Sequence, residues 1–151
     1  MFLEDKEWDL AREYCEKVLD RHPENAQAYL GKLMADCRVC DVDSLADCRA
    51  PFDDNKNYKK ILRFGDAGLV KKLEEYVRGI KVRNEETRLA EQYARASRHM
   101  RRAKFVHEYQ EAQREFEKLK DYKDSRELAE LCAQKVEKMI EDDKNRIYQS
   151  A

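Results

Sequence analysis

The first part of the chain repeats apolar residues at the three- and four-residue spacing of amphipathic helices. His22-Pro23 ends the first helix, because the residue before a proline disfavours helical backbone. Asn25 is then placed to cap a second helix. The apolar positions of the first helix are Trp8, Ala11, Cys15, Val18 and Leu19, and those of the second are Ala26, Tyr29, Leu30, Leu33 and Met34. The pattern predicts an antiparallel helical hairpin.

The apolar pattern is looser between residues 37 and 57. Ser44 or Asp43 can cap a short turn through Leu45, and the Pro-, Asp- and Asn-rich stretch that follows predicts an ordered corner. We expect Phe52 to anchor this corner in the core.

One long or bent helix is expected around residues 66–103, after a short helix that ends at Gly65. The short helix carries Tyr58, Ile61, Leu62 and Phe64; the long one carries Leu69, Leu73, Tyr76, Val77, Ile80, Leu89, Tyr93, Ala96 and Met100. The apolar stripe is interrupted across residues 81–88, so the helix either bends near Asn84 or crosses solvent there. Gly79 would make a bend less costly.

A second hairpin is predicted at the end of the chain, with Asp124 and Glu127 forming a capping-box-like pair between its helices. Its apolar positions are Tyr109, Ala112, Phe116 and Leu119 in one helix and Leu128, Leu131, Cys132, Val136 and Ile140 in the other. No segment alternates with period two over the length of a strand. We therefore predict an all-α fold with at least six helices and no sheet.

Two segments of the chain align without gaps: EWDLAREYCEKVLDRHPEN at 7–25 and EYQEAQREFEKLKDYKDSR at 108–126. The alignment superposes Trp8 on Tyr109, Ala11 on Ala112, and Cys15 on Phe116. The offset of 101 residues is close to three periods of about 34 residues. An aromatic residue, a small Ala three positions on and a bulky residue four later resemble the second helix of a tetratricopeptide repeat.

The segments AYLGKLMA, PFDDNKNYKKILRF and EFEKLKDYKDSRELAELC are similar to parts of uncharacterised bacterial tetratricopeptide-like proteins, many of which carry a zinc-ribbon-like segment before the helices. The resemblance implies antiparallel helical hairpins with a degenerate middle and no known activity. It implies one domain over 1–151, divided into a partial first repeat (1–36), the degenerate middle (37–83) and a last hairpin with a terminal helix (84–147). Leu33 and Met100 depart from the consensus, which has Gly at those places.

Composition supports helices with solvated faces. Charged residues make up 42% of the chain, yet 31 Lys and Arg against 32 Asp and Glu leave a net charge of −1, with only four Gly and two Pro. Disorder usually combines high net charge with no apolar period, whereas this chain has a strong period. A chain that is not basic overall is not expected to bind nucleic acid.

The location predicted from the sequence is the cytoplasm, without membrane insertion. No apolar run approaches the roughly 20 residues that a membrane-spanning helix needs. The acidic N-terminal stretch lacks the basic and apolar parts of a signal peptide. Five cysteines without a regular framework fit reduced thiols better than disulfides.

CRVC at 37–40 is the sharpest metal signal, with Cys48 as a third ligand and His22 as a fourth. A second Cys-x-x-Cys pair is missing, so ordinary reduced cysteines are preferred over zinc or a redox pair. His22, His99 and His107 show no partner residues of a nucleophilic site, and no glycine-rich phosphate loop is present. We expect no catalytic residue, no cofactor and no metal, and hence no enzyme.

The basic run RASRHMRRAKFVH at 95–107 is the remaining candidate site. Arg98 and Arg101 should share a helix face, with Phe105 as an apolar contact beside them. In tetratricopeptide arrays this helix would line the groove, where arginines can hold an acidic peptide or a terminal carboxylate. A plainer interpretation is a solvated helix balanced by Glu108, Glu111 and Glu115.

The sequence thus favours a non-catalytic helical-repeat scaffold that binds a protein or peptide of unknown identity. The alternative is a structural or self-association part of a longer regulatory protein, and a homo-oligomer is left open.

Overall fold

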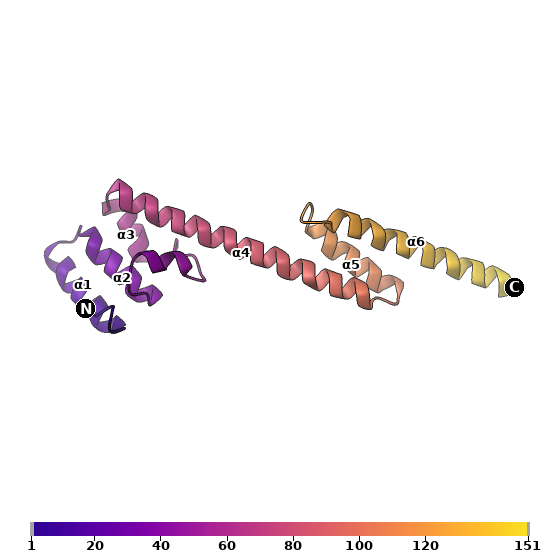
Figure 1. The fold of residues 1–151 in the computed structure, drawn as a ribbon, viewed down its shortest axis with the longest axis horizontal. Coiled ribbons are helices and arrows are strands. Elements are labelled where there is room, and N and C mark those ends of the chain that lie inside the picture. The colour runs from indigo at the N-terminus through magenta and orange to yellow at the C-terminus, as the bar shows by residue number, and fades with distance from the viewer. Residues whose placement is uncertain (1, 151) are drawn as a thin grey trace. The chain divides into compact units, whose positions relative to one another are not determined.

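The structure is a computed structural model that describes residues 2–150, without the side chain of Ser150. In these residues the chain forms six α-helices, one 3-10 helix and no strand, so the all-α prediction is confirmed (Figure 1). The elements are α1 (Trp8–Arg21), α2 (Ala26–Cys37), η1 (Asp43–Asp47), α3 (Lys56–Phe64), α4 (Ala67–Arg102), α5 (Val106–Lys118) and α6 (Ser125–Ser150).

The chain divides into two compact units, unit 1 up to residue 84 and unit 2 from residue 85, and α4 contributes residues to both. The sequence predicted a last hairpin that begins at residue 84, one residue before the start of unit 2, within a single domain. That single-domain organisation stays a prediction. No helix within 2–150 combines the length and the apolar character that crossing a bilayer requires.

Most helix ends have the local causes that the sequence indicated. His22, before Pro23, closes α1 with a bond from its backbone N–H to the carbonyl oxygen of Val18. The Asn25 side chain accepts the backbone N–H of Ala28 at 3.0 Å and so begins α2. One cap differs from the prediction, because Asp41, and neither Ser44 nor Asp43, accepts the backbone N–H at the start of η1.

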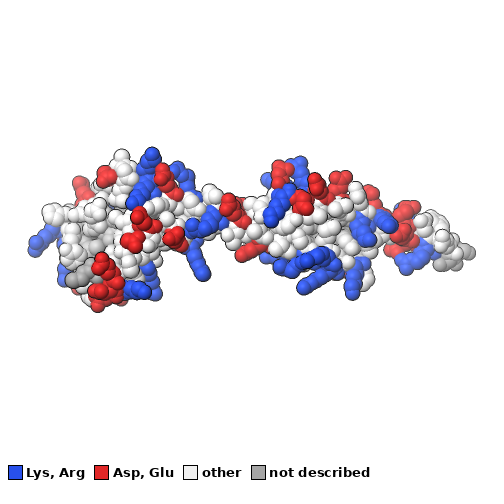
Figure 2. All heavy atoms as spheres, viewed as in Figure 1, with Lys and Arg blue, Asp and Glu red and all other residues white. Residues whose placement is uncertain are grey.

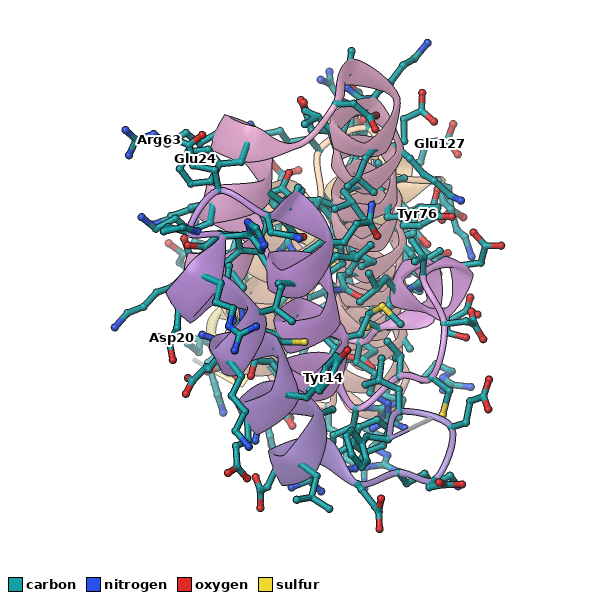
Figure 3. All side chains as sticks on the ribbon, turned by 90° about the vertical axis from the view of Figure 1, so that its left-hand side faces the viewer. Tyr14, Asp20, Glu24, Arg63, Tyr76 and Glu127 are labelled. Carbon is teal, nitrogen blue, oxygen red and sulfur yellow. The ribbon has the colours of Figure 1, made fainter. Side chains whose placement is uncertain are left out.

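The core of unit 1 joins α2, α3, η1 and the first part of α4. Its buried residues are Leu30, Leu33, Met34, Leu45, Phe52, Tyr58, Ile61, Leu73, Val77 and Ile80. Phe52 is buried, as predicted, and its ring packs edge-on against Tyr58 with centroids 5.3 Å apart. Tyr76, labelled in Figure 3, donates its hydroxyl to Asp43 at 2.7 Å and ties η1 to α4.

The polar stretch inside α4 stays helical, and every side chain of residues 81–88 is exposed. The solvent-crossing alternative therefore describes this segment. Within unit 1, the Asn84 amide donates to the carbonyl of Arg49 at 2.7 Å, and Arg83 donates to that of Cys48 at 2.8 Å. These bonds connect the polar part of α4 to the corner after η1.

Unit 2 has a separate core, formed by the C-terminal part of α4 with α5 and α6. Its buried residues are Ala96, Ala112, Phe116, Leu119, Ala129 and Cys132. The sequence also placed Leu131 and Ile140 on the apolar face of α6, and both placements are wrong, with exposures of 49% and 41%. Leu131 lies off the face that packs on α5, which carries Cys132 and Val136, and Ile140 lies beyond the last buried residue of the helix.

Candidate functional site

The C-terminal end of α4 carries two of the three residues that the sequence singled out. α4 turns Tyr93, Ala96 and Met100 towards the core of unit 2. With 3.6 residues per turn, Arg98 falls on the side of the helix opposite Ala96. Arg98 and Arg101 are both exposed, on the solvent side of α4.

The third residue, Phe105, is presented by the loop that starts α5. Glu108 accepts the backbone N–H groups of Lys104 and Phe105, both at 3.0 Å. These two hydrogen bonds, of which the one from Lys104 has the larger effect, hold the pKa of Glu108 below its ordinary value. The Phe105 ring stacks on His107 with centroids 6.0 Å apart and stays 61% exposed. A hydrogen-bonded loop therefore holds an aromatic ring at the surface.

The arginines at the end of α4 have no acidic partner in the described part of the chain. Glu108 is occupied by the loop, and Glu115 binds Nδ1 of His99 at 2.7 Å. No ion pair or side-chain hydrogen bond joins any of the four arginines to another described residue. These four, named here the basic face of α4, are Arg95, Arg98, Arg101 and Arg102.

The basic face contrasts with several arginines elsewhere. Arg12 pairs with Asp9 and Asp36, and Arg88 pairs with Glu85. Figure 2 shows Lys and Arg side chains gathered along the lower edge of unit 2, over the C-terminal part of α4. The balancing pairs that the sequence suggested with glutamates of α5 are not formed in the described residues. Arg101 and Arg102 still interact favourably with the helix C-terminus on which they stand.

A hollow of about 210 Å³ borders the basic face in unit 2. Gln92, Arg95, Glu115 and Lys118 line it. One carboxylate oxygen of Glu115, Oε2, is buried without a hydrogen-bond partner in the described residues. The hollow therefore offers a ligand the cationic side chains of Arg95 and Lys118 beside the carboxylate of Glu115.

The cysteines are arranged differently from the Cys-x-x-Cys prediction. Cys37 and Cys48, but not Cys40, line a hollow of about 440 Å³ beside the corner after η1. Burial and the neighbouring Cys48 thiol raise the pKa of Cys37 to about 12. Because the thiolate is the metal ligand and nucleophile, the raised pKa of Cys37 disfavours both roles.

A metal site was a weaker alternative in the sequence, with His22 and three cysteines as ligands. Within residues 2–150, no three His, Cys, Asp or Glu side chains are grouped so that they could hold a metal ion. The expectation of a metal-free protein stays a prediction.

One polar centre of unit 1 was missed by the sequence analysis. Asp36 accepts hydrogen bonds from Arg12 (2.9 Å), Asn55 (3.0 Å) and Asn57 (2.8 Å). Burial raises the pKa of Asp36, but these hydrogen bonds outweigh it, so the pKa lies below its ordinary value. The donors lie 24, 19 and 21 residues away in the chain, so no local sequence signal could have indicated the contact.

Comparison with protein-family models, with curated proteins and with solved structures finds no match for this chain. The resemblance to tetratricopeptide-like proteins therefore has no independent support from relatives.

Proposed function

We propose that this chain is a non-catalytic helical scaffold that binds an acidic segment of a partner protein. The basic face of α4 supplies the charges and Phe105 supplies an apolar contact. The observation that carries the proposal is the set of four neighbouring arginines without an acidic partner in the described residues. Guanidinium groups bind carboxylates through paired, charge-assisted hydrogen bonds, so such a set favours an acidic ligand.

Two further features support the same surface. Phe105 is an exposed aromatic ring on an ordered loop, and aromatic residues are prominent among the contacts that dominate binding energy. Exposed arginines also attract an acidic segment before contact, which raises the association rate at low salt.

The repeat arrangement belongs to this proposal. We infer that α1 and α5 are the second helices of degenerate repeats of the tetratricopeptide type, and that the C-terminal part of α4 is the first helix of the last repeat. Ala11 and Ala112, which the internal alignment superposes, are both buried, at 4% and 0% exposure. We also infer a reducing, cytoplasmic location, supported by an odd number of cysteines, all of which are free.

The test is binding of a fluorescein-labelled oligoglutamate peptide with one central leucine, measured by fluorescence anisotropy. Changing Arg98→Glu together with Arg101→Glu should weaken binding at least about tenfold, because two attractive charges become repulsive. Binding to the unchanged protein should weaken as salt rises, since the Debye length falls from about 10 Å at 0.1 M to about 3 Å at 1 M.

The matched control is Lys56→Glu with Lys59→Glu, which makes the same change in charge at exposed, three-residue spacing on α3. This control should keep its affinity within about twofold, because the changed residues belong to unit 1 and take no part in the proposed contact. Equal losses in both variants would mean that only net charge matters. Unchanged binding by the arginine variant, or its unfolding, would overturn the proposed surface.

A further inference from the structure

Two of the five cysteines, Cys37 and Cys48, lie beside each other in unit 1. Both line the hollow of about 440 Å³ beside the corner after η1, and both pack against the core of unit 1. A side-chain hydrogen bond joins the two thiols. Neither side chain is fully buried, so the hollow gives small molecules access to the pair.

Backbone hydrogen bonds hold each of the two cysteines in place. Cys37 is the last residue of α2, and the backbone N–H of Val39 bonds back into this helix at 3.0 Å. Cys48 donates its backbone N–H to the carbonyl oxygen of Leu45 at 3.3 Å, and its own carbonyl oxygen accepts from Arg83 at 2.8 Å. Because both residues are already fixed, joining their sulfurs costs little conformational freedom.

Cys40 is nearer to Cys37 in the sequence but is placed differently. It does not line the hollow, and Cys48 is the cysteine that influences Cys37. Arg38, with a left-handed backbone (φ 55°), ends α2 and turns the chain between Cys37 and Cys40. The structure therefore brings Cys37 together with a cysteine eleven residues away and not with its partner in the Cys-x-x-Cys motif.

We propose that Cys37 and Cys48 are a redox-modification site, at which a low-molecular-weight disulfide such as oxidised glutathione converts the two thiols into an intramolecular disulfide. The new bond joins the end of α2 to the corner after η1, and small thiols reverse it. In a reducing environment the pair stays a dithiol, in agreement with the free cysteines of this structure. The site lies in unit 1 and shares no residue with the basic face of α4, so it stands or fails separately from the proposed acidic ligand.

Two exchange steps produce the disulfide. The Cys48 thiolate attacks one sulfur of the small disulfide, which forms a mixed disulfide at Cys48 and releases one small thiolate. The Cys37 sulfur then attacks the Cys48 sulfur and displaces the second small thiolate. The two protons of the protein thiols pass to the two released thiolates. Two protein thiols are thus oxidised, and one small disulfide is reduced to two thiols.

The surroundings of Cys37 set the order of these steps. Burial and then the neighbouring Cys48 raise the pKa of Cys37 to about 12, so its thiol is a poor first nucleophile. In the second step the sulfur under attack is already beside it, and this proximity offsets the small thiolate fraction. A thiolate of high pKa is also the intrinsically stronger nucleophile. Cys48 is therefore modified first, and Cys37 completes the bond.

The disulfide restrains a segment that also contacts α4. The carbonyl oxygens of Cys48 and Arg49 accept hydrogen bonds from Arg83 and Asn84, at 2.8 and 2.7 Å. A covalent bond to α2 limits the local opening of this corner, so amide hydrogen exchange at residues 45–50 should slow about tenfold in the oxidised chain. Cys48→Ser, treated in the same way, should show no such change. Equal exchange in the oxidised and reduced chains would overturn the proposed restraint.

The bond itself is tested by mass spectrometry of the folded, reduced full chain after incubation with oxidised glutathione and alkylation of the remaining thiols. Two of the five thiols should be lost, and dithiothreitol should restore them. Trypsin cuts after Lys32, Arg38 and Arg49, so the bond should link peptide 33–38 to peptide 39–49, and fragmentation should place it at Cys48. Five remaining thiols, a bond at Cys40 or a bond between two chains would overturn the proposal.

Serine variants test the role of each cysteine. Cys37→Ser should accumulate glutathione on Cys48, because the thiol that completes the bond is missing. Cys48→Ser should form neither the disulfide nor an adduct at Cys37, since Cys37 is a poor first nucleophile. Cys40→Ser is the matched control and should form the disulfide at a rate within about twofold of that of the unchanged protein. Loss of two thiols in Cys48→Ser, or their retention in Cys40→Ser, would show that a different pair reacts.

Discussion

At the scale of single residues, Gly31 and Asp36 control how α1 packs on α2. Gly31 lies within α2, and a Cβ built there would stand 2.6 Å from the sulfur of Cys15 on α1. Glycine therefore permits the close approach of the two helices, a role that the consensus comparison at Leu33 did not reveal. The Asp36 carboxylate, near the end of the same helix, accepts hydrogen bonds from Arg12 of α1 and from two asparagines at the start of α3. One contact is steric and the other electrostatic, and both can be tested by single substitutions.

Gly31→Ala should lower the free energy of unfolding by about 1 kcal/mol, measured by urea denaturation. Alanine gains about 1 kcal/mol of helix propensity, but the clash with Cys15 costs about 1–3 kcal/mol. The control is Gly31→Ala combined with Cys15→Ala, which removes the sulfur. The loss due to alanine at position 31 should then disappear, so the two changes should be strongly non-additive. If Gly31→Ala alone is stabilising, the helices separate more easily than the structure indicates.

Asp36→Asn should destabilise the protein by about 1–2 kcal/mol at pH 7, because hydrogen bonds to a charged acceptor are worth about 1.5–3 kcal/mol and Asp36 is partly exposed. The pKa of Asp36 is lower in the folded state than its unfolded value of about 3.9. Its contribution is therefore fully present above that value and is lost as the pH falls through the folded pKa. The difference between the two proteins in thermal denaturation should shrink between about pH 5 and pH 2. A difference that is independent of pH would contradict a role for the charge.

At the scale of the elements, the period of the apolar residues predicted which segments are helical, and proline, glycine and asparagine predicted several of the ends. What failed was the assignment of individual side chains to the core. Leu131 and Ile140 fit the apolar pattern, but Leu131 lies off the face that packs on α5 and Ile140 lies beyond the last buried residue of α6. Neither fact follows from the sequence of α6 alone. Similarly, the sequence could not predict that Asp41 caps η1, because several neighbouring carboxylates and hydroxyls could each have accepted the same backbone N–H.

The candidate site was predictable only in part. The basic run identified Arg98, Arg101 and Phe105 as residues of interest, and their exposure follows from the helix period. Whether the arginines are paired could not be predicted, because it depends on which carboxylates are already occupied. Glu115 binds His99, sixteen residues away, and Glu108 turns back to its own loop.

Phe116→Ala should lower the free energy of unfolding by about 3–4 kcal/mol, because it leaves a cavity in the core of unit 2. Phe116 is fully buried, at 0% exposure, and its ring lies edge-on to Tyr93. Phe105→Ala, at the N-cap of α5, makes the same chemical change at an exposed ring and should cost less than about 0.5 kcal/mol. Chemical denaturation of both variants measures the contrast. Equal costs would mean that α5 packs through a different face.

At the scale of the whole molecule, the chain has two cores that share no residue. Leu73, Val77 and Ile80 of α4 belong to the core of unit 1, and Ala96 of the same helix belongs to that of unit 2. Between them, residues 81–88 contribute only exposed side chains. A helix can transmit stability along its backbone bonds, but the packing energy that holds each unit comes from its own core. The two units should therefore differ in how they respond to loss of core packing.

Amide hydrogen exchange on the full chain tests this independence with one core substitution in each unit. Leu33→Ala should cost about 3 kcal/mol and lower protection in α2, α3 and the first part of α4 by about a hundredfold. Phe116→Ala should do the same for α5, the first half of α6 and residues 89–102, because local stability follows local burial. Each variant should leave the slowest amides of the other unit nearly unchanged, and each therefore serves as the control for the other. Uniform loss of protection across both units in either variant would show that they unfold as one cooperative body, and the exposed segment of α4 would then couple two cores that have no side chain in common.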